Sequence, residues 1–243
     1  MRIIKLDAID STNTFLKEIS SADVVEDFTV IVTNYQKSGR GQMGTNWDSK
    51  KGKNLTFSVF KDVSFLAFDK QFYISIITSL ALIKTLKANN IPKLSVKWPN
   101  DILSADKKLC GVLIENVIKK NELASSIIGV GLNVNQVSFE TLPKASSMQI
   151  ISKNSYDLDE VLQVFIEHLK KYFKLLKANR IDELKEEYES YLFRKNKPST
   201  FRDEEGVLFS GFIKGVSQTG NLIVLLEDNI LKEFSLKQIA LLY

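Results

Sequence analysis

Apolar positions along the chain recur with two different periods, which predicts an alternation of strands and helices. Six segments are rich in β-branched residues or alternate apolar with polar residues, and each is bounded by turn residues. We expect strands at residues 2–6, 28–34, 54–60, 94–98, 108–117 and 125–134. The last two are separated by the turn sequence KKNE at 119–122, which predicts a hairpin.

Helical spacing marks three longer segments. The apolar residues of segment 70–88 recur every three or four positions, so it should form an amphipathic helix on the sheet. Asp157 and Glu160 form a capping-box pattern that opens a long helix, with apolar residues from Val161 to Leu176 on one face. A charged helix should follow at 181–192, and Ser11-Thr12-Asn13 should cap a short helix at 14–19.

Composition changes after residue 195. Asn196-Lys197-Pro198 marks a boundary, and the chain beyond it holds only short apolar segments separated by DEEG, QTGN and EDN. Strands are expected at 200–202, 208–217, 221–226, 231–235 and 239–242. We therefore predict an α+β fold of two domains. Residues 1–195 form a mixed sheet with packed helices, and residues 196–243 form a small β-barrel of SH3-like size.

Composition excludes several classes of protein. The 243 residues carry a net charge of only +4, too little for a general nucleic-acid binder, so no nucleic-acid partner is expected. One Cys and one His exclude an internal disulfide and argue against a Cys/His metal site. Neither a signal peptide nor a spanning segment is recognisable, so we expect a cytoplasmic protein without a membrane partner.

Polar and glycine residues gather at four places near predicted strand ends. A cationic loop begins with Gly39-Arg40-Gly41, and Lys97-Trp98-Pro99-Asn100-Asp101 ends a strand. The second pattern is also compatible with a simple Asx turn after a buried strand. Lys108 precedes Gly111, and Gly129 and Gly131 lie on one face of a strand, where they leave space for a ligand.

These segments together resemble the biotin–protein ligases, a family that attaches biotin to a lysine of a carboxylase carrier domain. The segments that carry the resemblance occur in the family's order: Ser11-Thr12-Asn13, Tyr35-Gln36 with Gly39-Arg40-Gly41, Trp47 with Asn54-Leu55, Lys97-Trp98-Pro99-Asn100-Asp101, Lys108-Leu-x-Gly111 and Gly129-x-Gly131-x-Asn133. The resemblance implies a catalytic domain like that of class II synthetases, in a short form that lacks an N-terminal DNA-binding domain.

The family's reaction joins the biotin carboxylate to the α-phosphate of ATP and then passes the acyl group to a lysine. Two anions must meet, so fixed positive charge is needed. By resemblance, Arg40 and Lys108 bracket the two anions as catalytic residues, and Asp101 orients Lys108 or the incoming lysine. ATP and biotin are the implied substrates, with Mg²⁺ as cofactor and no metal site built by the protein alone. The implied partner is a biotin carboxyl carrier domain.

The resemblance also assigns binding residues. Biotin is expected to contact Ser11, Thr12, Asn13, Gln36, Gly39, Arg40, Gly41, Gln42, Lys108, Gly111 and Gly129. The nucleotide is expected to contact Arg40, Trp47, Asn100, Lys108 and Asn133. The loop at 40–53 should be mobile in the free protein and close over both substrates.

One part of the loop departs from a common form of the family motif. Gln42 and Thr45 stand where many members carry arginines, so Lys50, Lys51 and Lys53 are candidates to supply the missing charge. Two alternatives were weighed against this function. A lipoate ligase would carry a different glycine-rich loop ending in a histidine, whereas the single histidine here is His168. A biotin-responsive transcriptional regulator would carry a helix-turn-helix ahead of the catalytic segment, which here is expected to begin at residue 1. An edge strand could pair with a second subunit or with the carrier domain, and the sequence favours neither.

Overall fold

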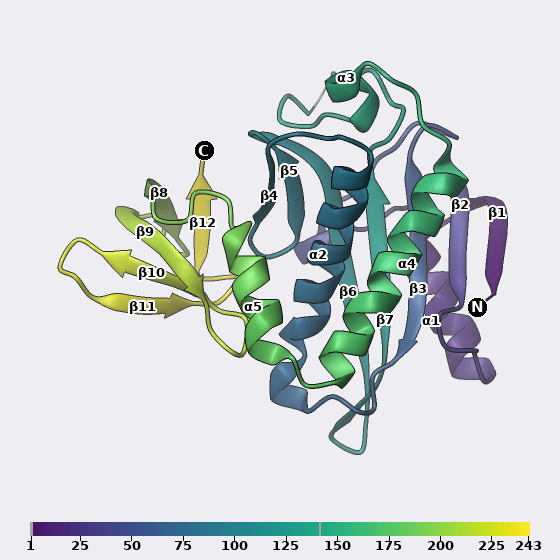
Figure 1. The fold of residues 1–243 in the computed structure, drawn as a ribbon, viewed down its shortest axis with the longest axis horizontal. Helices are drawn as coiled ribbons and strands as arrows, with labels where there is room; N and C mark the ends of the chain where they lie inside the picture. The colour runs from purple at the N-terminus through teal and green to yellow at the C-terminus, as the bar shows by residue number, and fades with distance from the viewer. Residues whose placement is uncertain (1, 141) are drawn as a thin grey trace.

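The computed structural model describes residues 2–140 and 142–243, which form two sheets and their covering helices (Figure 1). The larger sheet has seven strands in the order β1-β2-β3-β7-β6-β5-β4. Its strands are β1 (Ile3–Ile9), β2 (Val30–Gln36), β3 (Leu55–Asp62), β4 (Leu94–Lys97), β5 (Asp101–Ser104), β6 (Lys107–Lys119) and β7 (Glu122–Leu132). Only β1 and β2 pair in parallel, so the predicted mixed sheet is confirmed.

The long hairpin of β6 and β7 forms the centre of this sheet. Its two turn residues, Lys120 and Asn121, both have positive φ, of 51° and 62°. Two-residue turns of this kind match the twist of the flanking strands, which explains why a short polar sequence suffices to reverse the chain. The predicted hairpin is therefore confirmed.

Helices cover both faces of the sheet. On one face lie α2 (Phe72–Ala88), α4 (Leu158–Lys177) and α5 (Ile181–Ser190), while α1 (Thr12–Ala22) lies behind the sheet (Figure 1). Alternate residues of the strands divide accordingly: Phe57 and Val59 of β3 join the core under α2 and α4, whereas Phe60 joins the small cluster around Leu16 of α1. The short helix α3 (Met148–Ser152) was not predicted.

Helix α2 differs from the expectation of an amphipathic helix. Twelve of its 17 residues are buried, because α4 and α5 cover the side that faces away from the sheet. The N-terminus of α4 agrees with the prediction, since the Asp157 side chain accepts hydrogen bonds from the backbone N–H groups of Asp159 and Glu160. No helix in the described part of the chain is both long and apolar enough to cross a membrane.

The C-terminal sheet has the five predicted strands, in the order β11-β10-β9-β8-β12. They are β8 (Pro198–Asp203), β9 (Leu208–Val216), β10 (Leu222–Leu226), β11 (Leu231–Phe234) and β12 (Ile239–Leu242). The predicted small β-domain is present, but it is not a closed barrel, because among the described residues no hydrogen-bond ladder joins β11 to β12. Buried residues of this sheet share one core with the larger sheet, and the division at 195 stays a prediction.

Strand β5 was missed by the sequence analysis. Its four residues follow Lys97 after a turn of only three residues. The segment is therefore too short to show a strand pattern of its own in the sequence. Asp101 therefore lies at the start of a strand and not in a loop. This placement brings its carboxylate onto the sheet, where the neighbouring strand can contact it.

Candidate active site

A cavity of about 440 Å³ opens on the α1 side of the large sheet. It is lined by the start of α1, the loop after β2, the adjoining ends of β4 to β7 and the edge of the C-terminal sheet. Thirteen of the predicted site residues line it: Ser11, Thr12, Asn13, Gln36, Arg40, Gly41, Gln42, Trp47, Asn100, Asp101, Lys108, Gly111 and Gly129. Gly39 and Asn133 do not line it.

One row of paired residues crosses the cavity floor. Lys97 of β4 pairs with Asp101, Asp101 with Gly111, Gly111 with Gly131, and Gly131 with Thr56 of β3. Directly paired residues of neighbouring strands present their side chains on the same face of a sheet. A lysine and an aspartate therefore stand at one end of a row whose middle is two adjacent glycines.

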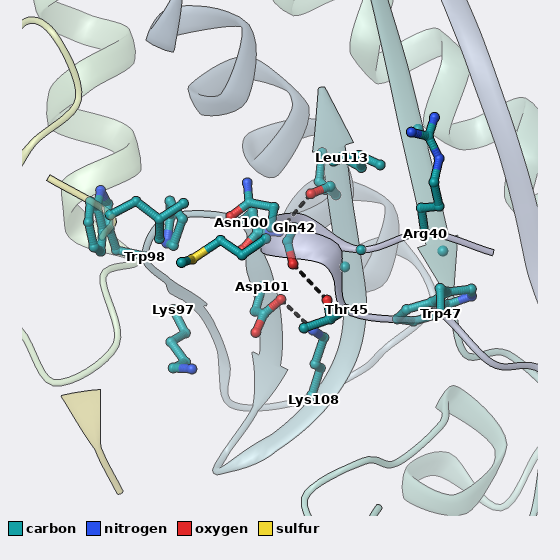
Figure 2. Close-up of a pocket in the computed structure, with 18 of the residues that line it drawn as sticks. Arg40, Gln42, Thr45, Trp47, Lys97, Trp98, Asn100, Asp101, Lys108 and Leu113 are labelled. Atoms are coloured by element: carbon teal, nitrogen blue, oxygen red, sulfur yellow. Dashed lines mark hydrogen bonds and ion pairs between the residues drawn. The ribbon is translucent and has the colours of Figure 1, made fainter. Parts of the chain in front are cut away.

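A β-bulge brings Lys108 onto the face of this row. Ile102 pairs with Cys110 but Leu103 pairs with Lys108, so Leu109 is an extra residue that reverses the alternation of side chains. Lys108 Nζ then lies 2.6 Å from Asp101 Oδ1 (Figure 2). The preceding Lys107 points elsewhere, and its ammonium donates to the carbonyl of Pro143.

The glycines do not leave the floor bare as expected. A Cβ on Gly131 would come within 2.2 Å of Trp47 Cε2, and one on Gly111 within 3.3 Å of Trp47 Cζ3, so the indole lies across both. The space above Gly129 is filled by the side chain of Asn13, 2.3 Å from the position of a Cβ. The Nε1 of Trp47 is buried and has no hydrogen-bond partner among the described residues, so it is available to a ligand.

Buried polar groups at the start of α1 form the other end of the cavity. The Thr12 backbone N–H and hydroxyl both donate to Gln36 Oε1, at 2.8 and 3.0 Å. Ser58 Oγ lies 2.7 Å from Thr12 Oγ1 and 2.6 Å from Asn13 Oδ1. Helix α1 begins at Thr12, two residues earlier than predicted, and this places these polar side chains in its first turn.

Arg40 faces away from Lys108 and is paired with a residue that the sequence analysis missed. Its Nη2 lies 3.0 Å from Glu115 Oε2, and the same carboxylate oxygen accepts a hydrogen bond of 2.8 Å from Asn13 Nδ2. Figure 2 shows the guanidinium on the far side of the cavity from Lys108, turned away from it. Glu115 is the one acidic residue of β6, directly after the apolar run at 112–114, and this was the signal that could have identified it.

The loop carrying Arg40 is folded on itself. The Gly41 N–H donates to the Thr45 carbonyl at 2.6 Å, and Thr45 Oγ1 donates to the Gln42 carbonyl at 2.8 Å. The predicted substitute cations Lys50, Lys51 and Lys53 do not line the cavity, and Lys51 instead pairs with Asp7 at 2.7 Å. Their role in holding the adenylate stays a prediction.

The two asparagines assigned to the nucleotide both donate hydrogen bonds to backbone carbonyls. Asn100 Nδ2 donates to the carbonyl of Val112 at 2.7 Å, and Asn133 Nδ2 donates to the carbonyl of Ser146 at 3.0 Å. Asn100 still lines the cavity, whereas Asn133 is 4% exposed and lies outside its lining. Their amides position β6 and the loop that follows β7.

Several charged residues that were not predicted also reach the cavity. The C-terminal sheet and its last turn contribute Arg202, Asp203 and Lys237, and β4 contributes Lys97. Burial lowers the pKa of Lys97, with Asp101 opposing the shift and two other lysines adding to it. Sequence spacing alone could not bring the C-terminal residues next to residue 101.

Comparisons with known proteins agree with this architecture. A family model described as the biotin/lipoate A/B protein ligase family matches residues 6–133. The chain is 27% identical over 237 residues to the bifunctional ligase/repressor BirA of Bacillus spizizenii, across 96% of this chain and 72% of that protein. It is 32% identical over 143 residues to the biotin–[acetyl-CoA-carboxylase] ligase of Mycobacterium tuberculosis, across 57% of this chain and 51% of that one.

A solved structure is similar over the whole chain. The biotin protein ligase from Aquifex aeolicus in complex with biotin and ATP superposes with a TM-score of 0.83 at 29% identity, covering 99% of this chain and 98% of that one. The family model itself spans more than half of the 243 residues. The chain belongs to the biotin/lipoate A/B protein ligase family.

Proposed function

We propose that the protein is an ATP-dependent biotin–protein ligase that modifies a lysine of a biotin carboxyl carrier domain. The observation that carries the proposal is the Asp101–Lys108 pair, held at 2.6 Å beside a glycine floor in the cavity. The similarity to a ligase solved with biotin and ATP, over 99% of this chain, supports the same function.

The reaction has two steps, formation of biotinyl-AMP and transfer of biotin to the acceptor lysine. A carboxylate oxygen of biotin attacks the α-phosphorus of ATP, the bond to the β-phosphate breaks, and pyrophosphate leaves with the electron pair. The amine of the acceptor lysine then attacks the acyl carbon, an amide forms, and AMP leaves as the amine loses a proton. The protein has little covalent work to do, so positioning and charge carry the rate.

The geometry suggests how the substrates lie. The buried hydroxyl and amide groups of Thr12, Gln36 and Ser58 suit the ureido ring of biotin. From there an extended chain would run along Gly131 and Gly111 once the Trp47 indole, which lies across both glycines, has moved off them. Among the described residues, the indole Nε1 has no hydrogen-bond partner. The biotin carboxylate would then reach Lys108, next to the α-phosphate of ATP.

Arg40 takes part in this reaction only after it leaves Glu115. A carboxylate substrate offers the guanidinium a second acceptor inside the cavity, where a charge-assisted contact is stronger than at the partly exposed Glu115. Turning toward the substrate would pull the 40–47 loop over the cavity. The closed loop would exclude water from the acyl adenylate.

Mg²⁺ fits the site as an ion carried by the nucleotide. Among residues 2–140 and 142–243, no group of three or more His, Cys, Asp or Glu side chains is arranged to hold a metal ion. Mg²⁺ usually binds through one or two carboxylates together with substrate phosphates, and Asp101 and Asp203 line the cavity. When bound, it would neutralise charge on the phosphates.

The carrier domain requires an accessible surface beside the cavity. Strand β1 is a free edge of the large sheet, whereas the other edge, β4, is bridged at Val96 by Leu192. An edge strand offers unpaired N–H and C=O groups to another chain. Strand β1 can therefore dock the carrier domain or pair with a second subunit to form a homodimer. We place the reaction in the cytoplasm.

The test is incubation with biotin, ATP labelled at the α-phosphate, Mg²⁺ and a biotin carboxyl carrier domain. Biotinyl-AMP should appear without the carrier, and label should pass from the adenylate pool to AMP as the carrier lysine is biotinylated. No pyrophosphate above background with all substrates saturating would refute the proposal. Lipoate replacing biotin as the better substrate would favour the lipoate branch of the family. A salt-dependent shift of biotin-operon DNA would identify a regulator.

A further inference from the structure

Three lysines gather where the larger sheet meets the C-terminal sheet, next to the proposed reaction centre. Lys97 Nζ lies 4.9 Å and Lys144 Nζ 3.8 Å from the centre of the Tyr243 ring. Lys97 is paired with Asp101 across β4 and β5, and Asp101 contacts Lys108. Figure 2 shows Lys97 beside the Asp101–Lys108 pair.

Positive charge in this group exceeds negative charge. Lys108 and Lys144 both act on Lys97, and within the described residues Asp101 is the carboxylate that acts on it, while Asp101 and Asp106 act on Tyr243. Burial lowers the pKa of Lys97, and the charges of Lys108 and Lys144 lower it further against the influence of Asp101. A cluster of partly desolvated like charges is unfavourable by itself and becomes favourable when an anion binds.

The position of Lys97 along the cavity indicates which anion it would bind. The row of paired residues runs from Thr56 through Gly131 and Gly111 to Asp101 and ends at Lys97. Neighbouring strands lie about 4.8 Å apart, so Lys97 stands about 10 Å beyond Gly111, on the side away from the polar groups of α1. A phosphate chain whose α-phosphate is at Lys108 would meet Lys97 if it extended along this row, away from α1.

We infer that Lys97, assisted by Lys144, binds the β- and γ-phosphates of ATP and holds the pyrophosphate as it leaves. The inference rests on the proposed function and adds to it a residue for the leaving group. Negative charge develops on the oxygen between the α- and β-phosphates as that bond breaks, and the ammonium of Lys97 stabilises it. Tyr243 holds the two lysines in place through contacts of their ammonium groups with its ring.

Pyrophosphate takes part in only one of the two steps, which allows a sharp test. Lys97→Ala should lower kcat/KM for ATP in biotinyl-AMP formation by about 10- to 100-fold, the usual value of one hydrogen bond to a charged group. It should raise the KM for pyrophosphate in the reverse reaction similarly. Transfer of biotin from preformed biotinyl-AMP to the carrier domain should stay within about twofold of wild type. Lys97→Arg should recover part of the loss.

Lys107→Ala is the matched control, because Lys107 contacts the Pro143 carbonyl outside the cavity. It should leave both half-reactions unchanged. Lys144→Ala, at an exposed position, should weaken the use of pyrophosphate to a smaller extent and serves if Lys97→Ala does not fold. Equal slowing of both half-reactions, or an unchanged KM for pyrophosphate in both variants, would overturn the inference. A wild-type protein that makes no biotinyl-AMP would refute the proposed function, and the inference with it.

Discussion

The two cations proposed to act in the reaction, Lys108 and Arg40, come from different kinds of structure. Lys108 belongs to the central hairpin and is held at 2.6 Å from Asp101 inside the cavity. Arg40 belongs to a loop that lines the cavity, and its guanidinium lies 3.0 Å from Glu115, a residue that does not line it. We call Lys108 and Asp101 the strand half of the site, and the 40–47 loop with Arg40 the loop half. The charge of the strand half already lies in the cavity, whereas the charge of the loop half is paired with Glu115.

The difference follows from what fixes each side chain. Lys108 is directed by a bulge in the pairing of β5 with β6. Its backbone also bonds to Lys144 and Ser146, so moving it would break these hydrogen bonds. Arg40 is held by one ion pair in which the arginine side chain is 46% exposed, and such pairs contribute at most about 1 kcal/mol. A substrate carboxylate can replace that contact easily. The preformed half can orient ATP, while the loop half can close only when substrate is present.

Removing the charge of the strand half should have the largest effect. Lys108→Ala should slow biotinyl-AMP formation by about 30- to 1,000-fold, since one charge-assisted contact in a closed site contributes roughly 2–4 kcal/mol to the transition state. Lys108→Arg should not restore the rate, because a planar guanidinium does not fit the space of an ammonium beside Gly111. Pyrophosphate release measures the rate.

Lys107→Ala is the neighbouring control and should be nearly silent, because the bulge turns Lys107 to the Pro143 carbonyl. Thermal melting of both variants separates loss of activity from loss of folding. A damaging Lys107→Ala with a mild Lys108→Ala would show that the register of this strand is wrong, and the assignment of the catalytic lysine would be withdrawn.

The strand half was also the more predictable from the sequence. The spacing of apolar residues, together with capping and turn residues, predicted the two long helices α2 and α4 and the β6–β7 hairpin. These features depend on residues close together in the chain. The family motifs named thirteen residues that line the cavity, because each motif is a short segment that can be matched without knowing the fold. The bulge at Leu109 could not be predicted, since it depends on how β6 pairs with β5, a strand of four residues.

The loop half and the C-terminal wall were less predictable. The Arg40–Glu115 pair joins residues 75 positions apart, and no local pattern specifies such a contact. The same holds for Arg202 and Lys237, which reach the cavity from the second sheet. The open order of that sheet was missed because strand spacing predicts the number of strands but not whether the first and last pair.

Disturbing the contact between the two halves should give an intermediate effect. Gly131→Ala places a Cβ 2.2 Å from Cε2 of Trp47, so the indole must move off the floor. Overpacking of this kind typically costs about 1–3 kcal/mol. If this cost destabilises the enzyme with its substrates bound, adenylation should slow by about 5- to 150-fold. Gly111→Ala is the milder control, because its Cβ would lie 3.3 Å from the same indole. A shift of tryptophan fluorescence in Gly131→Ala checks the cause, and equal activity of the two variants would contradict it.

Closure of the loop half should be visible as protection from protease. Residues 40–53 should be cleaved in the free protein and protected by biotin together with ATP, because the glycine- and lysine-rich segment opens easily. Ligands at about ten times their Kd should lower the open population, and with it the cleavage rate, about tenfold. Mass spectrometry of the fragments locates the cuts. Cleavage rates that do not change with ligands would remove the argument for closure.

Freeing Arg40 from Glu115 should have the smallest effect. Whether the KM for biotin falls or rises then shows what Glu115 does. Glu115→Gln removes the negative charge that competes for Arg40, while the amide oxygen can still accept the hydrogen bond from Asn13. Since the Arg40 side chain is 46% exposed, the ion pair contributes at most about 1 kcal/mol, so the KM for biotin should fall by up to about fivefold. Added salt should lower the KM of the wild type toward that of the variant, because it screens the Arg40–Glu115 attraction. The double variant with Arg40→Ala should show no further gain from Glu115→Gln. A KM that rises in Glu115→Gln would mean that Glu115 positions Arg40 for the substrate, and the loop half would then be preformed like the strand half.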